Sequence, residues 1–351
     1  MNIDKIISDF YKFGQILNEF SSNDGYNNTL QIIDNNSIEE LNQEIENAIH
    51  FNAWFTPENI RKSFAGLSHM LSEEKLKSWI EMYTTTNFNP PNPKIIGVVM
   101  AGNIPLVGFH DLLSILISGN IALVKFSSSD NRLWPHLLSI LYKIDSEYKN
   151  RIKISGDKLK GFDAVIATGS NNTARYFDYY FGKYPNIIRK NRNGVAIIKG
   201  NESKDDLKNL ADDIFSFFGL GCRNVSKIYI PDDYRLDNIF EQLYDYNPII
   251  NRHKYANNFD YNRTVMMLNK DDILENGFVI FKSEKDIASP LACVYYERYS
   301  DLDNLKSELK IMEERIQCIV SSDDIPFGNS QKPELWDYAD GVDTIEFLGS
   351  L

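Results

Sequence analysis

One cysteine of this sequence lies where a catalytic nucleophile would be expected. Cys222 follows the segment Gly219-Leu220-Gly221 and precedes Arg223. The two glycines allow the backbone to pass close to a bound group, and a polar, partly exposed position beside a cation favours the reactive thiolate form of a cysteine. The alternative is a small apolar residue in a turn between a helix and a strand. This segment alone supports both interpretations equally.

Asn103 has a side chain that could stabilise a developing oxyanion. It lies in the segment AGNIPL, directly after a predicted strand over residues 94–100. In parallel α/β sheets, ligands bind at the carboxyl ends of the strands. An amide NH₂ group there can donate to an oxyanion, a contact worth about 3 kcal/mol in other enzymes. The alternative is an ordinary turn asparagine before a helix, which this segment alone favours.

A lysine and three serines lie at the carboxyl end of the next predicted strand, over residues 121–126. Lys125, Ser127 and Ser128 place one cation and two hydroxyls at the carboxyl end of that strand. These groups suit a nucleotide ribose or its phosphate. The alternative is that the serines and Asp130 cap a helix that starts near residue 131, with an exposed lysine before it.

A third strand is predicted over residues 163–168, and Gly169 and Ser170 follow it at the start of a helix. The N–H groups and the dipole of a helix N-terminus attract phosphate. A single Gly-Ser turn is weak evidence for a phosphate site, since no G-x-G-x-x-G motif follows any predicted strand.

Short apolar segments alternate with helical patterns from residue 94 onward, which predicts parallel sheets built from βαβ units. A proline-rich segment over residues 87–94 separates this part from residues 1–90, where helical periodicity predominates. The alternation restarts after residue 194, so we expect two α/β lobes that meet near residues 190–200. Further strands are predicted over residues 195–198, 227–230, 277–281, 292–297 and 318–320, and helices over residues 38–51, 57–71, 106–116, 131–143 and 205–218.

The composition argues against several classes of protein. The chain has 351 residues, 43% of them hydrophobic, which is enough for substantial cores. A net charge of −12 argues against a general nucleic-acid-binding role. The three cysteines form neither a disulfide framework nor a zinc motif. The sequence shows no signal peptide and no apolar run of about 18 residues, so we expect a soluble protein of a reducing, cytoplasmic compartment.

In this order and spacing, the four segments resemble the aldehyde dehydrogenase superfamily and, within it, the LuxC-type acyl-CoA reductases. The most similar parts are residues 97–130, 218–231 and 325–344, and the resemblance covers roughly residues 60–351. It implies an α/β fold of two parallel-sheet lobes with an N-terminal helical cap. The expected parts are a helical region (1–92), an NADP-binding Rossmann-like domain (93–196), a catalytic cysteine domain (197–322) and a tail that returns to the cofactor lobe (323–351).

The resemblance implies a reaction for two of these residues. Cys222 would be the acyl-accepting nucleophile, and Asn103 would stabilise the oxyanion together with the backbone N–H of Cys222. The implied activity is reduction of a fatty acyl-CoA or acyl thioester to the aldehyde. Two alternatives stay open: an acyl-phosphate reductase of the same superfamily, and a non-catalytic subunit that only carries the acyl group.

The resemblance also implies a cofactor site. Lys125 would contact the adenosine ribose, and Gly169 with Ser170 would form the turn over the pyrophosphate and the nicotinamide end. Asp286 falls, in a loose match, where many relatives place a glutamate on the nicotinamide ribose. Many NAD-specific relatives carry a glutamate at the position of Ser128, which would repel a 2′-phosphate. The neutral serine therefore favours NADPH.

The glutamate that activates water in the hydrolytic members of the superfamily has no counterpart here. The corresponding residues 189–194 contain no carboxylate. This points away from oxidation of an aldehyde to an acid, because that reaction must hydrolyse the acyl-cysteine. The alternative is a different base, such as Glu202. The resemblance further implies an acyl-protein synthetase as a partner and leaves a homo-oligomer open.

Other chemically capable residues have simpler explanations. Cys293 and Cys318 lie in apolar strand contexts, so we expect them to be buried and inert. His110 is expected to have a structural role in a helix near the site. The cations over residues 189–192 are expected in a solvated loop, with the phosphates of coenzyme A as the alternative partner.

Overall fold

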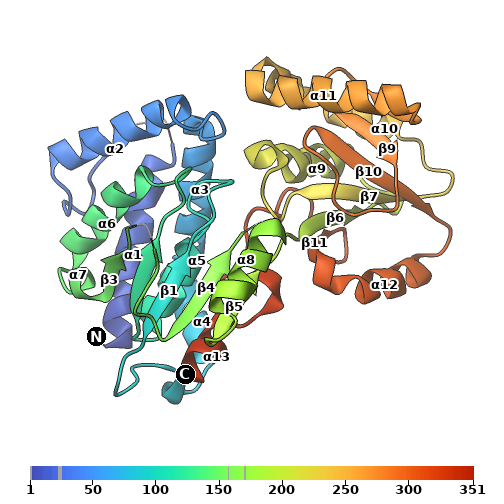
Figure 1. Ribbon diagram of the computed structural model, residues 1–351. Coiled ribbons are helices and arrows are strands. Elements are labelled where there is room, and N and C mark those ends of the chain that lie inside the picture. Colours follow the sequence, from blue (N-terminus) through green and yellow to red (C-terminus); the bar gives the residue numbers. More distant parts are fainter. Residues whose placement is uncertain (1, 23–25, 157, 170) are drawn as a thin grey trace. The chain divides into compact units, whose positions relative to one another are not determined.

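The protein is described by a computed structural model, shown in Figure 1. The structure describes residues 2–22, 26–156, 158–169 and 171–351. The chain divides into two compact units: residues 1–190 and 332–351 form unit 1, and residues 191–331 form unit 2. Each unit is built around its own β-sheet.

Unit 1 contains a five-stranded parallel sheet with the strand order β3-β2-β1-β4-β5. The strands are β1 (Ile95–Val99), β2 (Ile121–Lys125), β3 (Ile152–Ile154), β4 (Ala164–Thr168) and β5 (Asn186–Arg189). β1, β2 and β4 lie where the apolar segments predict strands. The short strands β3 and β5 lie where no strand is predicted. β3 has three residues, two of them exposed, so it carries no apolar run of the length that marks a buried strand.

Helices supply most of the hydrophobic core of unit 1. They are α1 (Ile3–Phe20), α2 (Asn35–Asn47), α3 (Pro57–Met70), α4 (Glu73–Glu81), α5 (Phe109–Ile117), α6 (Leu133–Ile144), α7 (Tyr148–Arg151), α8 (Asn171–Phe181) and α13 (Thr344–Gly349). The first helix buries Ile6, Phe10, Phe13 and Leu17, a spacing that places them on one helical face. Phe13 stacks on Phe109 with the ring centroids 5.8 Å apart, which fixes α1 against α5.

The C-terminal segment packs into unit 1. Trp79 donates its indole N–H to the Tyr338 hydroxyl at 2.7 Å, and Tyr83 donates to the Asp343 carboxylate at 2.7 Å. Ile345 in α13 is fully buried in the same core. Residues 332–351 therefore complete the unit formed by residues 1–190, although residues 191–331 separate the two in sequence.

Unit 2 contains a six-stranded mixed sheet with the order β11-β6-β7-β10-β9-β8. The strands are β6 (Asn193–Ile197), β7 (Val225–Pro231), β8 (Ile273–Glu275), β9 (Ile280–Ser283), β10 (Cys293–Tyr299) and β11 (Ile316–Val320), and the helices are α9 (Lys204–Phe215), α10 (Asp237–Gln242), α11 (His253–Asn269) and α12 (Leu302–Ile311). β8 pairs antiparallel with β9, whereas the other pairs are parallel. The turn between β8 and β9 contains Gly277 with φ of 92°, and such a short connection suits antiparallel strands. The second sheet, expected to be parallel, is therefore mixed, because this one strand pair at its edge is antiparallel.

Two local expectations are also wrong. α6 begins at Leu133 without a side-chain cap, so Ser127 to Asp130 do not cap it. Arg189 is not in a solvated loop: it lies on β5, is only 4% exposed, and forms an ion pair with Asp111 at 2.6 Å. In both cases the polar side chain is used by a segment distant in sequence.

Candidate active site

Three of the predicted site segments leave neighbouring strands at one edge of the unit 1 sheet. β1 lies between β2 and β4, with Val99 opposite both Lys125 and Ala167. Because the strands are parallel, the loops that follow them start at the same edge, so the loops of Asn103, Lys125 and Gly169 are adjacent. The strand order reverses between β1 and β4, and open α/β sheets bind ligands at such a switch point.

The loops after β1 and β2 pack directly against each other. A Cβ atom on Gly102 would lie 2.5 Å from Ser127 Oγ, so a glycine is needed at this close approach. Met100 donates its backbone N–H to the Lys125 carbonyl at 3.0 Å. Asn103, the residue after Gly102, is exposed. The structure therefore brings the Asn103 segment together with the lysine and serine segment.

The side chains predicted to bind the cofactor are accessible. Lys125 and Ser127 are half-buried, whereas Ser128 is exposed. Gly169 is half-buried, and a Cβ atom on it would meet Thr173 at 3.0 Å. Ser170 lies outside the described residues. This edge of the sheet therefore carries the ammonium group of Lys125, the hydroxyls of Ser127 and Ser128, and Gly169, all of them accessible to a ligand.

Asp130 fixes the loop that carries Asn103. Its Oδ2 accepts the backbone N–H of Leu106 at 2.7 Å, and the residue is 3% exposed. Leu106 has a φ of 64°, in the left-handed region that is unfavourable for leucine and needs support from its surroundings. Burial raises the pKa of Asp130 to about 7, against the opposing effect of the Leu106 hydrogen bond.

In unit 2, Cys222 lies in the loop between α9 and β7. α9 ends at Phe215, three residues before the predicted end, because Phe217 and Phe218 have left-handed φ values of 52° and 61°. Gly219 continues this conformation with φ of 77°. Non-glycine residues in this region are strained, and such strain concentrates at functional sites. The cysteine segment is therefore held in a conformation that helix propensity alone would not produce.

The three cysteines differ in accessibility. Cys222 is exposed, whereas Cys293 and Cys318 are buried, as the sequence predicts. Burial raises the pKa of the Cys293 thiol to about 12, so this thiol stays protonated at neutral pH. Cys222 is thus the cysteine that a substrate can reach.

Asp286 is the other predicted site residue in unit 2. It lies between β9 and β10, is exposed, and forms an ion pair with Arg315. Its carboxylate also accepts the backbone N–H of Ile287 at 2.8 Å. The structure gives Asp286 a structural partner and an accessible position, and its role toward a cofactor stays a prediction.

The sequence reasoning missed Asn224, which lies two residues after Cys222. It is 2% exposed, and its Oδ1 accepts the backbone N–H of Gly221 at 2.8 Å. Its position in the sequence indicates this role, because Asn224 directly precedes the buried strand β7 and a buried amide requires hydrogen-bond partners.

His110 and Asp343 have structural roles. The His110 Nε2 atom lies 2.8 Å from the Leu335 carbonyl oxygen, and burial lowers the pKa of this imidazole. Asp343 caps α13 by accepting the backbone N–H of Glu346 at 3.0 Å. Among the described residues, no group of three or more His, Cys, Asp or Glu side chains could hold a metal ion.

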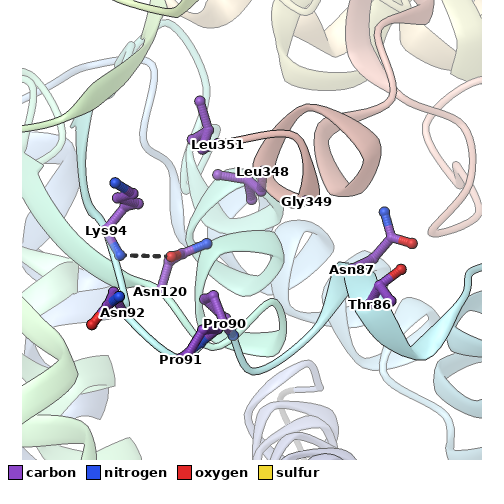
Figure 2. Close-up of a pocket in the computed structure, with 10 residues that line it drawn as sticks. All are labelled: Thr86, Asn87, Pro90, Pro91, Asn92, Lys94, Asn120, Leu348, Gly349 and Leu351. Carbon is purple, nitrogen blue, oxygen red and sulfur yellow. Dashed lines mark hydrogen bonds between the residues drawn. The ribbon is translucent and has the colours of Figure 1, made fainter.

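A cavity of about 280 Å³ lies at the other edge of the unit 1 sheet. Figure 2 shows the residues that line it. It is lined by Thr86, Asn87, Pro90, Pro91, Asn92, Lys94, Asn120, Leu348, Gly349 and Leu351. Lys94 and Asn120 directly precede β1 and β2, so the cavity faces the amino ends of the strands. The Asn120 amide is already used by Lys94 N–H at 2.9 Å and by Ser118 Oγ at 3.0 Å. This cavity is therefore separate from the predicted site.

None of the helices in the described part of the chain is long and apolar enough to cross a membrane.

Solved aldehyde dehydrogenases have a similar fold. Aldehyde dehydrogenase 21 from Physcomitrella patens, in complex with the reaction product succinate, matches with a TM-score of 0.58 at 14% identity, over 92% of this chain and 77% of that chain. NADP-dependent glyceraldehyde-3-phosphate dehydrogenase from Bacillus halodurans C-125, complexed with NADP, matches with a TM-score of 0.59 at 9% identity, over 91% of this chain and 74% of that chain. No curated protein sequence matches this chain. The fold is that of the aldehyde dehydrogenases.

A family model described as acyl-CoA reductase (LuxC) matches residues 1–245. The chain belongs to the LuxC acyl-CoA reductase family, and it is an enzyme, an aldehyde-related oxidoreductase. The match begins at residue 1, so the N-terminal helices are part of the region shared with the family. The separate segments predict a resemblance over roughly residues 60–351, whereas the family model matches residues 1–245.

Proposed function

We propose that this protein reduces a fatty acyl-CoA, or another acyl thioester, to the aldehyde with NADPH, through an acyl-cysteine on Cys222. The exposure of Cys222 next to a strained segment is the observation that carries the proposal. Cys222 belongs to unit 2, whereas Asn103 and most residues proposed to hold the cofactor belong to unit 1. The proposal requires both units to act on one substrate.

In the proposed reaction, the Cys222 thiolate attacks the carbonyl carbon of the thioester and forms a new C–S bond. The Asn103 amide NH₂ and the Cys222 backbone N–H donate to the resulting oxyanion. The bond from this carbon to the sulfur of coenzyme A then breaks, coenzyme A leaves as the thiolate, and the acyl group stays on Cys222. After reduction of the acyl carbon, the resulting alkoxide re-forms its C=O bond while the bond to Cys222 Sγ breaks, which releases the aldehyde and restores the thiolate.

The carboxyl edge of the unit 1 sheet is the proposed binding site of NADPH. Gly102 allows the loops after β1 and β2 to pack closely, which gathers the Asn103 segment and the lysine and serine segment at this edge. When bound, NADPH supplies the hydride that reduces the acyl carbon. The residues proposed to hold it are Lys125, Ser127, Ser128, Gly169, Ser170 and Asp286. Ser128 is neutral and exposed, and Asp130, the nearest carboxylate along the chain, is buried, which favours a ligand with a 2′-phosphate.

Release of the acyl group as aldehyde, and not as acid, is supported by the two places where a base for water was considered. Residues 189–194 contain no carboxylate, and Glu202 is the alternative base. Its two carboxylate oxygens accept the backbone N–H groups of Lys199 at 2.6 Å and Gly200 at 3.0 Å. A carboxylate held in a turn in this way is poorly placed to activate water.

Labelled acyl-CoA without NADPH tests the proposal. The wild-type protein should retain label on Cys222, and Cys222→Ala should neither retain label nor form aldehyde. Cys318→Ala, a change at a buried cysteine, is the matched control and should be labelled like the wild type. Aldehyde formation by Cys222→Ala would contradict the mechanism.

A panel of acyl donors tests the substrate class. If an acyl phosphate is turned over and no acyl-CoA is, the substrate of the proposed reaction is an acyl phosphate and not a thioester. If no donor causes NADPH consumption while Cys222 still becomes acylated, the protein is an acyl-carrying subunit and not a reductase.

The proposed setting is a reducing, cytoplasmic compartment, which agrees with three free cysteines. An acyl-protein synthetase is the proposed partner, because an acyl group on a partner's cysteine can pass to Cys222 by the same thioester exchange. Sedimentation of the purified protein, alone and mixed with such a synthetase, tests this partnership and the proposed homo-oligomer.

A further inference from the structure

Asn224 uses both ends of its side-chain amide to hold the segment around Cys222. Its Oδ1 accepts the backbone N–H of Gly221 at 2.8 Å. Its NH₂ group donates to three backbone carbonyls, those of Asp213 at 2.9 Å, Ser216 at 3.0 Å and Ile214 at 3.3 Å. The side chain is buried, so these contacts are shielded from competition by water.

The carbonyls of Asp213 and Ile214 belong to the last turn of α9, and Ser216 is its C-cap residue. The last turn of a helix leaves its C=O groups without partners in the helix. Beyond them the chain runs through the left-handed residues Phe217 and Phe218. Asn224 contacts Ser216 before this strained segment and Gly221 after it. It therefore bridges the two ends of the conformation that brings the chain to Cys222.

The backbone of Asn224 closes a turn around Cys222. Its N–H donates to the Gly221 carbonyl at 3.1 Å, which makes residues 221–224 a β-turn with Cys222 at the second position. Its carbonyl accepts the backbone N–H of Gly194 at 3.0 Å, which anchors this turn to β6. Gly221 and Asn224 are buried, whereas Cys222 between them is exposed. Cys222 is therefore exposed in a turn whose first and last residues are buried.

We propose that Asn224 is a positioning residue that sets the orientation of the Cys222 thiol and backbone N–H, an inference that rests on the proposed role of Cys222 as nucleophile. The amide is suited to this role because it combines an acceptor for Gly221 with two donor hydrogens for the helix carbonyls. A carboxylate keeps the acceptor and loses both donors. A protonated carboxyl regains one donor.

This difference provides a test that a merely structural role would not satisfy. The rate of Cys222 acylation by acyl-CoA is measured without NADPH for the wild type and for Asn224→Asp between pH 5 and pH 8. We expect the Asn224→Asp rate to be at least about tenfold lower at pH 8. Its ratio to the wild-type rate should rise toward one at pH 5, as the buried carboxyl takes up a proton. The apparent affinity for NADPH should not change.

The controls separate this inference from the proposed function. Asn257→Asp, at an exposed asparagine of α11, should match the wild type at every pH. Circular dichroism establishes that each variant is folded. Asn224→Ala removes both the acceptor and the donors, and if it fails to fold, the pH profile of Asn224→Asp still tests the proposal. A folded Asn224→Asp that acylates within twofold of the wild type at every pH overturns the positioning role. Aldehyde formation by Cys222→Ala, in contrast, overturns the proposed nucleophile itself.

Discussion

The Asp130 carboxylate accepts the backbone N–H of Leu106 at 2.7 Å, and this one hydrogen bond joins the loop after β2 to the loop that carries Asn103. Leu106 is held with a φ of 64° at the point of contact. The carboxyl is buried, and burial outweighs the opposing hydrogen bonds from Leu106 and Trp134. Burial therefore favours the protonated form and raises the pKa of Asp130 to about 7.

Asp130→Asn should change the pH dependence of stability. The folded protein binds this proton more tightly than the unfolded chain, because the pKa is raised from its ordinary value of about 4. The protonated Asp130 carboxyl therefore contributes its full stabilisation to the folded protein below about pH 4. This contribution is lost as the pH rises to about 7. Asparagine keeps an oxygen for Leu106 and does not ionise. The variant should gain up to about 4 kcal/mol in unfolding free energy relative to the wild type across this range.

Urea unfolding at several pH values between 4 and 8 measures this difference. Asp178→Asn, at an exposed carboxylate of α8, is the control and should follow the wild type. A difference between Asp130→Asn and the wild type that does not vary with pH would show that Asp130 has no raised pKa.

Asn103→Ala should lower kcat by about 10²–10³, because it removes a donor to the proposed oxyanion. The KM for NADPH and the rate of Cys222 alkylation by iodoacetamide should stay at wild-type values, since neither involves the oxyanion. Asn150→Ala, at an exposed asparagine of α7, provides the control. Equal kcat values for Asn103→Ala and the wild type would remove Asn103 from the mechanism.

Ser128→Glu should reverse the cofactor preference. The new carboxylate would repel a 2′-phosphate at this exposed position, so the KM for NADPH should rise at least about tenfold while that for NADH changes little. Ser128→Gln has nearly the same shape without the charge and should keep the preference for NADPH. Steady-state kinetics with both cofactors decide the point, and a wild-type preference for NADH would refute the assignment.

Gly102→Ala should destabilise the contact between the two loops. The added Cβ atom would lie 2.5 Å from Ser127 Oγ and 2.8 Å from Ser127 Cβ, so the loops must separate. We expect a loss of about 1–3 kcal/mol in unfolding free energy, the usual effect of overpacking. Ser127→Gly removes the opposing atoms, so the double variant should recover part of the loss. Strictly additive effects in this cycle would mean that the two residues do not meet.

The sequence predicts the strands of the two sheets best where burial is continuous. β1, β4 and β6 each contain an apolar run, because a strand buried on both faces needs apolar side chains in succession. β3, β5 and β8 do not, since they have only three or four residues and are partly exposed. The family match agrees with the resemblance seen in the separate site segments.

The roles of the buried polar residues follow a different rule. The serines before Asp130 and Asp130 itself have the composition of a helix cap. The Asp130 carboxylate instead accepts the backbone N–H of Leu106, 24 residues away. Arg189 lies in a basic segment that suggests a solvated loop, yet its partner Asp111 is 78 residues away. Nothing near either residue in the sequence indicates these partners.

By itself, the sequence determined the chemistry that is available: one accessible cysteine in a glycine turn, an asparagine and a lysine after two strands, and a neutral Ser128. Each of these depends on residue type and on neighbours a few positions away. The tertiary structure decided which side chains hold those groups in place. Asp130 and Asn224 work through hydrogen bonds to backbone groups that only folding brings near, because a backbone N–H that is removed from water needs another acceptor.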